Sequence, residues 1–229
     1  KLIKNKKFDL IKVNGGKKIT GFNYKIPSDI SSSAFFIVLA ALSNKSTINI
    51  RNVNINPSRL GVIKILRKMG VKILIKNLRI YKGEKKANIH VISKENLKPI
   101  NCPTNLNSSA IDEFLLIFLL AARANGVSYF KNLSELNQKE SPRLFWGAKI
   151  LNKMGIKTIT TKDSIKIFGN PDLKIKKKII IKNFLKDHRI FMTSVIAALS
   201  FGGVWSIHDK DSIKTSFPNF LRIINDLKK

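Results

Sequence analysis

The sequence predicts an α/β fold made of repeated βαβαββ units, with buried helices and outer mixed sheets. Three segments of helical length and almost wholly apolar composition occupy residues 31–42, 111–124 and 188–199. A strand-like stretch follows each of them, and a second helical pattern follows each of those strands. Because a helix that is apolar on all sides has to be buried, we expect sheets to cover these three helices from outside.

The first two copies show the same order of elements in full. Their strands are expected at residues 47–53, 71–75, 79–82 and 88–92, and at residues 127–133, 156–159, 164–168 and 178–181. The second helix of each copy starts near residue 57 or 141 and ends in Lys-Met-Gly. Gly70 and Gly155 therefore supply the left-handed backbone conformation that commonly ends a helix.

The two ends of the chain differ from these copies. A shortened third copy has its helix at residues 188–199, a strand at 204–208 and a last helix near 217–227. Residues 1–28 read instead as two strands, at 8–13 and 19–26, that complete a unit begun earlier. We therefore expect residues 1–28 to be the tail of one domain and residues 29–229 to form a second domain.

Composition indicates a globular protein with a substantial core. The chain has 229 residues, of which 44% are hydrophobic, and a single cysteine, Cys102. The longest apolar run, residues 114–122, is shorter than the roughly 20 residues that span a membrane. No signal peptide is recognisable. We expect a cytoplasmic protein without a membrane-spanning segment.

The net charge of +29 is the most unusual property of the composition. Its lysines are spread along the whole chain, and no nucleic-acid-reading motif accompanies them. This pattern favours a generally basic surface that attracts anionic substrates over a nucleic-acid interface. A basic module that binds nucleic acid or another polyanion remains the alternative from a different functional class.

Charged residues interrupt the chain where each apolar helix begins. These positions are Asp29, Asp112 with Glu113, and the run from Asp187 to Arg189. Three helix N-termini on one side would direct their positive ends at one region, which favours anionic groups. The alternative is simple N-capping, which suits Asp29 and the serines after it. It suits Asp112 and Glu113 less well, because adjacent buried acids are costly.

A fourth charged region is the loop of residues 135–143, before the second helix of the middle copy. Pro142 at the start of that helix is favourable, since proline is common in a first helical turn. The corresponding loop of the first copy, residues 54–59, also carries a proline and an arginine, Pro57 and Arg59. We expect these two loops to share a structural role, although a solvated charged loop would look similar.

Six segments in this order resemble signatures of the EPSP synthase family and extend over essentially the whole chain. They are Ile26–Phe36 (IPSDISSSAFF), Asn56–Gly61 (NPSRLG), Ile111–Phe114 (IDEF), Glu135–Arg143 (ELNQKESPR), Asp187–Met192 (DHRIFM) and Thr215–Pro218 (TSFP). The resemblance implies the inside-out α/β barrel of that family, in which each of two domains contains three βαβαββ units. It also implies that this chain is the C-terminal half and lacks the N-terminal half.

The resemblance implies transfer of the enolpyruvyl group of phosphoenolpyruvate to the 5-hydroxyl of shikimate 3-phosphate, without metal or cofactor. Asp112 would be the base and Glu140 would exchange the proton at C3. Asp112 and Lys139 would contact shikimate 3-phosphate. Arg143 and Arg189 would bind phosphoenolpyruvate. His188 and Lys214 are further candidates. Lys214 is included because some relatives carry a lysine next to the motif that corresponds to Thr215–Pro218.

The chain departs from the family pattern next to these residues. Asn137 and Gln138 replace the usual Arg-Val, and Pro142 replaces an aspartate, which affects the expected placement of Arg143. Family segments that complete both substrate sites are absent, so we expect this chain alone to be inactive and its missing half to be its partner. The complete enzyme is expected to be monomeric. A degenerate fragment without catalysis is the other alternative.

Overall fold

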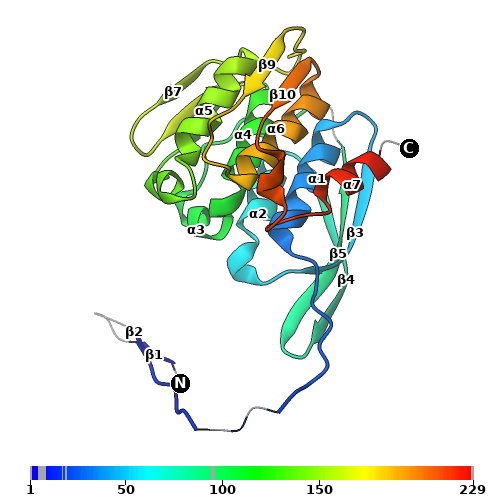
Figure 1. Cartoon of the computed structure of the whole chain (residues 1–229), viewed down its shortest axis with the longest axis vertical. Coiled ribbons are helices and arrows are strands. Elements are labelled where there is room, and N and C mark those ends of the chain that lie inside the picture. The colour runs from blue at the N-terminus through cyan, green and yellow to red at the C-terminus, as the bar shows by residue number, and fades with distance from the viewer. Residues whose placement is uncertain (1, 5–8, 17, 19, 94–95, 228–229) are drawn as a thin grey trace.

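Three helices form the centre of the structure, a computed structural model that describes residues 2–4, 9–16, 18, 20–93 and 96–227 (Figure 1). They are α1 (Ile30–Leu42), α4 (Phe114–Arg123) and α6 (His188–Phe201), and each packs against the other two. In α4, every residue from Phe114 to Ala122 is buried. The prediction that the three apolar segments are core helices is confirmed.

Sheets cover this helical centre, as the sequence predicted. One antiparallel sheet contains, in order, β3 (Thr47–Asn54), β5 (Glu84–Ile92) and β4 (Lys72–Tyr81). A second antiparallel sheet contains β6 (Val127–Phe130), β8 (Ile165–Phe168) and β7 (Thr158–Thr160). The third sheet pairs β9 (Lys178–Ile181) in parallel with β10 (Val204–Ile207).

Each central helix connects two segments that pair in parallel. Ser28 forms a bridge with Val53 across α1, Asn101 forms one with Tyr129 across α4, and β9 pairs with β10 across α6. Parallel neighbours need such a crossover because a tight turn cannot join them. The three repeats therefore share one topology, and the central helices run in equivalent directions.

Outer helices complete the repeats. They are α2 (Gly61–Lys68), α5 (Arg143–Met154) and α7 (Phe220–Asp226), and a short helix α3 (Asn107–Ala110) precedes α4. Gly70 and Gly155 follow α2 and α5 with φ of +93°, which confirms the expected helix ends. In α7, the Phe220 ring lies 5.6 Å from the Phe35 ring, so this helix packs on α1.

Some elements differ from the prediction in their bounds. The strands expected at residues 71–75 and 79–82 are one strand, β4, whose pairing is irregular between Lys76 and Arg79. Asn77 adopts a φ of +54° at this point, so the chain bulges without leaving the sheet. The helices expected from residues 57 and 111 begin instead with the 3₁₀ turns η1 (Pro57–Arg59) and η3 (Ile111–Glu113).

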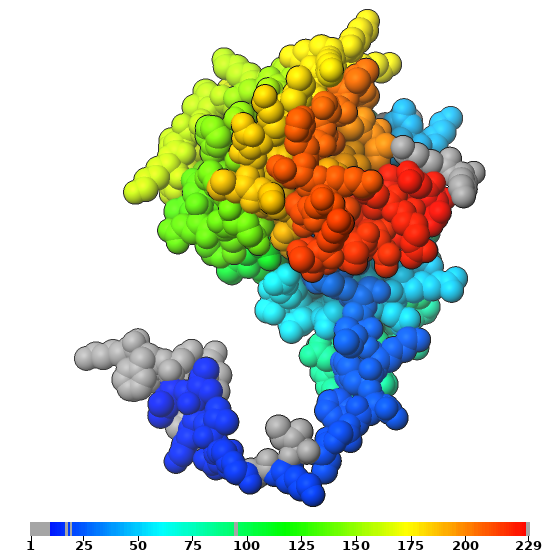
Figure 2. Space-filling view, in the orientation of Figure 1, coloured from blue at the N-terminus to red at the C-terminus, as the bar shows by residue number. Residues whose placement is uncertain are grey.

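The described residues up to residue 18 lie apart from the body, whereas Tyr24 and Ser28 contact the sheet that contains β3, β4 and β5 (Figure 2). A strand, β2 (Asp9–Ile11), forms within the expected range 8–13 and pairs with β1 (Leu2–Lys4); residue 8 lies outside the described residues. The prediction of a strand at residues 19–26 is wrong for residues 20–26, which form no strand; residue 19 lies outside the described residues. A strand is stable only beside a neighbouring strand, and residues 20–26 pair with none; Ser28, two positions later, forms a bridge with Val53.

The helical stretch Thr104–Arg123 is long and apolar enough to cross a membrane by composition alone. However, 67% of its most apolar window is buried inside the fold, as in the core helix of a soluble protein. Its apolar character is explained by packing within the three-helix centre.

Candidate functional site

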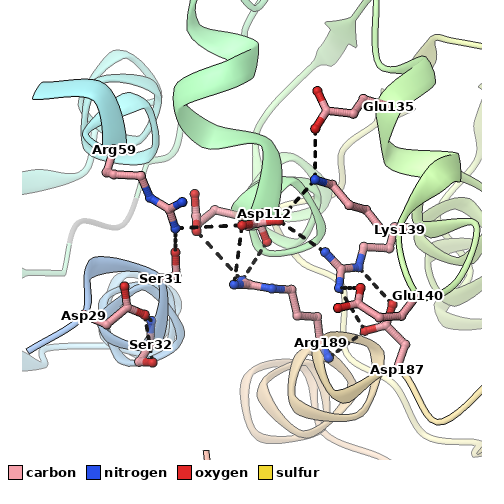
Figure 3. Close-up of polar contacts among 12 residues, drawn as sticks. Asp29, Ser31, Ser32, Arg59, Asp112, Glu135, Lys139, Glu140, Asp187 and Arg189 are labelled. Atoms are coloured by element: carbon pink, nitrogen blue, oxygen red, sulfur yellow. Dashed lines mark hydrogen bonds and ion pairs between the residues drawn. The ribbon is translucent and has the colours of Figure 1, made fainter. Parts of the chain in front are cut away.

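The N-terminal ends of the three central helices meet in one charged cluster (Figure 3). Asp112, in the turn before α4, lies at its centre. Arg189, in the first turn of α6, donates a hydrogen bond of 2.9 Å from Nη1 to the Asp112 carbonyl oxygen. Arg59, at the end of η1, donates one of 2.7 Å from Nη2 to Ser31 Oγ at the start of α1.

The carboxylate of Asp112 is surrounded by four cations. Its Oδ1 lies 3.4 Å from Arg143 Nη1 and 3.8 Å from Lys139 Nζ. Its Oδ2 lies 3.8 Å from Nη2 of both Arg59 and Arg189. The side chain is still 23% exposed. An accessible carboxylate held in one position is what a general base requires.

The loop of residues 135–143 supplies one side of this cluster. Lys139 Nζ donates a 2.9 Å hydrogen bond to Glu135 Oε1, which leaves it between two carboxylates. Glu140 accepts a hydrogen bond from Arg143 Nη2, and its side chain is 54% exposed. Glu140 is therefore accessible from solvent while one of its oxygens is held.

A buried ion pair fixes Arg143 in the cluster. Arg143 Nε donates a 2.9 Å hydrogen bond to Asp187 Oδ2, and both side chains are almost completely buried. Ser141 Oγ donates to the same oxygen at 2.8 Å. Burial by itself raises the pKa of Asp187, but the contacts of Arg143 and Ser141 outweigh it and lower that pKa below its usual value.

Pro142 and Asp187 both stabilise helix starts beside this pair. The Pro142 carbonyl accepts from Trp146 N at 3.0 Å as α5 begins. Asp187 Oδ1 accepts from Arg189 N at 2.9 Å and caps α6. The replacement of the family aspartate by Pro142 is thus compatible with a fixed Arg143.

Glu113 is a member of this cluster that the sequence did not assign to the site. Its side chain is only 2% exposed, its Oε1 has no hydrogen-bond partner, and that atom lies 3.8 Å from Arg189 Nη1. Burial raises the pKa of Glu113, against the opposing effects of Ser31 and Arg189. Two adjacent acids before an apolar helix were the signal for this buried group.

Two further sequence candidates have different surroundings. His188 is half-buried at the first position of α6, where burial and the charge of Arg189 lower its pKa. Lys214 is 73% exposed and forms a 2.8 Å ion pair with Asp211, so the structure does not bring it into the cluster. In the described part of the chain, no three His, Cys, Asp or Glu side chains gather as metal ligands.

Capping accounts for Asp29, as the simpler alternative predicted. Its Oδ2 accepts from Ser32 N at 2.7 Å at the start of α1. The lone thiol of Cys102 is buried, which raises its pKa to about 11 and makes it a poor nucleophile. A hollow of about 430 Å³, lined in part by Asp29, Asn56 and Arg59, borders the cluster.

Sequence comparison finds one family and many close relatives. The family model of EPSP synthase (3-phosphoshikimate 1-carboxyvinyltransferase) matches residues 2–224. A 3-phosphoshikimate 1-carboxyvinyltransferase of Ruthia magnifica subsp. Calyptogena magnifica is 42% identical over 213 residues, which cover 93% of this chain and 48% of the relative. That of Vesicomyosocius okutanii subsp. Calyptogena okutanii is 40% identical over 219 residues, with 94% and 48% covered. The chain spans about half the length of the curated relatives it matches.

Solved structures give the same result for the fold. The structure of EPSP synthase from Acinetobacter baumannii aligns with a TM-score of 0.85 and 38% identity, over 93% of this chain and 48% of that one. The enolpyruvyl transferase NikO from Streptomyces tendae aligns over 86% of this chain and 42% of that one, with a TM-score of 0.63. At 15% identity, the second similarity concerns the fold alone.

Proposed function

Because the chain belongs to the EPSP synthase family, we propose that it supplies half of an enolpyruvyl transferase site. The reaction joins phosphoenolpyruvate to the 5-hydroxyl of shikimate 3-phosphate and releases phosphate. The observation that carries this proposal is the Asp112 carboxylate, which lies among four cations where three helix N-termini meet. Such a region suits two substrates that carry phosphates and carboxylates.

The proposed first step is an addition with two proton transfers. The 5-hydroxyl oxygen forms a bond to C2 of phosphoenolpyruvate, and its proton passes to Asp112. At the same time, C3 receives a proton from Glu140. The product of this step is a tetrahedral intermediate that still carries the phosphate on C2.

The second step restores the double bond. The bond between C2 and the phosphate oxygen breaks, the phosphate leaves with the electron pair, and C3 returns a proton to Glu140. The exposed position of Glu140 supports this role, because a group that both gives and takes a proton has to reach the reacting carbon.

The cations have the complementary role of binding charge. Arg143 and Arg189 would hold phosphoenolpyruvate, since a planar guanidinium can bind a carboxylate or phosphate through two hydrogen bonds. Lys139 would contact the shikimate moiety. The buried Asp187 supports Arg143 by fixing its direction before any substrate binds.

We further propose that residues 1–28 belong to the first domain of such an enzyme and residues 29–229 to the second. The separation of β1 and β2 from the body supports this division (Figure 1). The rest of the family fold, which this chain does not cover, would close over the substrates. The assembled enzyme would act as a monomer in the cytoplasm.

Phosphate release from phosphoenolpyruvate and shikimate 3-phosphate tests the proposal. The chain is assayed alone and with the N-terminal half of the Ruthia magnifica relative, and turnover is expected only in the combination. Turnover by the chain alone would contradict the divided site. A folded but inactive combination would favour a degenerate fragment.

The polyanion-binding alternative has its own discriminating variant. Asp112→Ala should abolish transfer in the combination and leave heparin binding unchanged, because heparin would respond to the overall charge. Tight heparin or nucleic-acid binding by an inactive combination would instead favour the basic-module alternative.

A further inference from the structure

The internal repeat places two equivalent loops on one carboxylate. In each of the first two copies, the loop before the second helix carries a proline followed closely by an arginine. The fold brings Arg143 to Oδ1 of Asp112 and Arg59 to Oδ2. Both arginines lie within segments that resemble family motifs, but only Arg143 has a role in the function proposed above.

We propose that Arg59 is a further positioning residue, which holds Oδ2 of Asp112 from the side opposite Lys139 (Figure 3). The catalytic meaning of this inference rests on the proposed function. The contact between Arg59 and Asp112 can be tested without it.

Arg59 is held in place before any ligand arrives. Its Nη2 donates a 2.7 Å hydrogen bond to Ser31 Oγ, and Ser31 is only 2% exposed. The turn that carries Arg59 is itself capped, because Asn56 Oδ1 accepts from Ser58 N at 3.1 Å. A long side chain anchored at both ends loses less freedom when it positions a neighbour.

The other three cations each form an ion pair with a second acid. Arg143 is paired with Asp187 and Glu140, and Lys139 is paired with Glu135. Arg189 is paired with Glu113. Within the described part of the chain, Asp112 is the only acid that forms an ion pair with Arg59.

When Arg189 turns toward an anionic substrate, Oδ2 of Asp112 loses one of its two cations. Arg59 can then continue to hold that oxygen, because its anchor Ser31 lies outside the substrate contacts proposed above. An ion pair this exposed adds little stability, so its effect should appear in geometry and rate.

A double-mutant cycle in the 229-residue chain tests the contact. Arg59→Ala, Asp112→Asn and the double variant are compared by thermal unfolding. The shifts in Tm should be non-additive by about 1–3 °C, the range that an exposed ion pair gives in a chain of this size. Arg67→Ala is the matched control, because Arg67 donates to the Ile73 carbonyl away from the cluster and should be additive with Asp112→Asn.

Kinetics of the chain combined with the complementing N-terminal half test the positioning role. Arg59→Ala should lower kcat roughly 10- to 100-fold, with the KM for phosphoenolpyruvate changed by less than about 3-fold. Arg59→Lys should recover part of kcat, and Arg67→Ala should leave it unchanged. A merely structural arginine would give neither the kcat-specific loss nor the recovery.

The outcomes are separable from the fate of the proposed function. An additive cycle overturns the contact, and a non-additive cycle with an unchanged kcat overturns the positioning role. If the wild-type combination has no turnover, the proposed function fails while the cycle still decides the contact. Arg59→Gln serves in both experiments if Arg59→Ala does not fold.

Discussion

The two ends of the three-helix centre carry charge in different ways. At the C-terminal end, Arg123 closes α4 and donates from Nη1 to the carbonyls of Pro171 and Leu173 at 3.0 and 3.1 Å. Its Nη2 donates to the Ser200 carbonyl at 2.7 Å. Burial lowers the pKa of Arg123, and the charge of Asp172 opposes this effect. At the N-terminal end, charged side chains contact mainly one another.

The difference separates a structural cation, Arg123, from the cations that we propose to bind substrate. Three backbone carbonyls hold the Nη atoms of Arg123 in place, and its charge complements the negative helix ends. The cluster around Asp112, at the N-terminal ends of the central helices, instead contains five of the 14 acidic residues of the chain. These five acids share four cations, which are Arg59, Lys139, Arg143 and Arg189. Shared ion pairs can be exchanged when an anionic ligand enters, which is what a binding site requires.

The largest effect is expected from Asp112→Asn at the N-terminal end. Loss of the proposed base should lower kcat of the combined enzyme about 10²- to 10⁴-fold, as measured by phosphate release. Asp172→Asn, near the other end, is the control and should retain the wild-type rate. A folded Asp112→Asn variant with full activity would remove Asp112 from the mechanism.

The next largest effect concerns the buried pair. Asp187→Ala leaves Arg143 without its buried partner and should cost about 3–5 kcal/mol in the free energy of unfolding, measured with urea. Adding Arg143→Met should recover part of the loss, because no unpaired charge then remains. If the double variant is no more stable than Asp187→Ala, the unpaired charge of Arg143 is not the cause of the lost stability.

Arg123→Ala should weaken the C-terminal end without affecting the site. Loss of three hydrogen bonds to carbonyls should cost about 1–3 kcal/mol in the free energy of unfolding. The rate of phosphate release by the combined enzyme should not change. A loss of rate at full folded fraction would show that the two ends are coupled.

The smallest effect is a pH dependence due to Glu113. Because burial raises its pKa, the folded state binds this proton more tightly than the unfolded chain, whose glutamates titrate near pH 4.3. The wild type should therefore lose stability relative to Glu113→Gln as pH rises from about 4 through the raised pKa. Urea unfolding of both proteins from about pH 4 to 8 measures this difference. A difference that stays constant with pH would mean that Glu113 does not titrate as proposed.

Local sequence patterns were sufficient where neighbouring residues decide the structure. Asp29 accepts from Ser32 N, three positions away, so its cap could be predicted from the serines that follow it. Gly70 and Gly155 end their helices because their own backbone adopts positive φ. The fold class followed from the recurring apolar helices, since such segments are stable only when they are covered.

The sequence was insufficient to predict contacts between residues that are far apart in the chain. Arg143 and Asp187 are 44 positions apart, and no spacing rule predicts that they share a buried ion pair. The strand expected at residues 19–26 failed because its pattern lacks a partner along residues 20–26. Lys214 pairs with Asp211, three positions away, and its role in the site stays a prediction.

By itself, the sequence determined the repeated α/β organisation, the three buried helices and the positions at which charged residues begin them. Each of these depends on periodicity, composition or neighbours within a few residues. Only the tertiary structure decided that Arg59, Arg143 and Arg189 converge on Asp112, and that Glu113 is buried beside them. The reason is that the relative placement of three repeats is set by packing of their helices, which no single segment encodes.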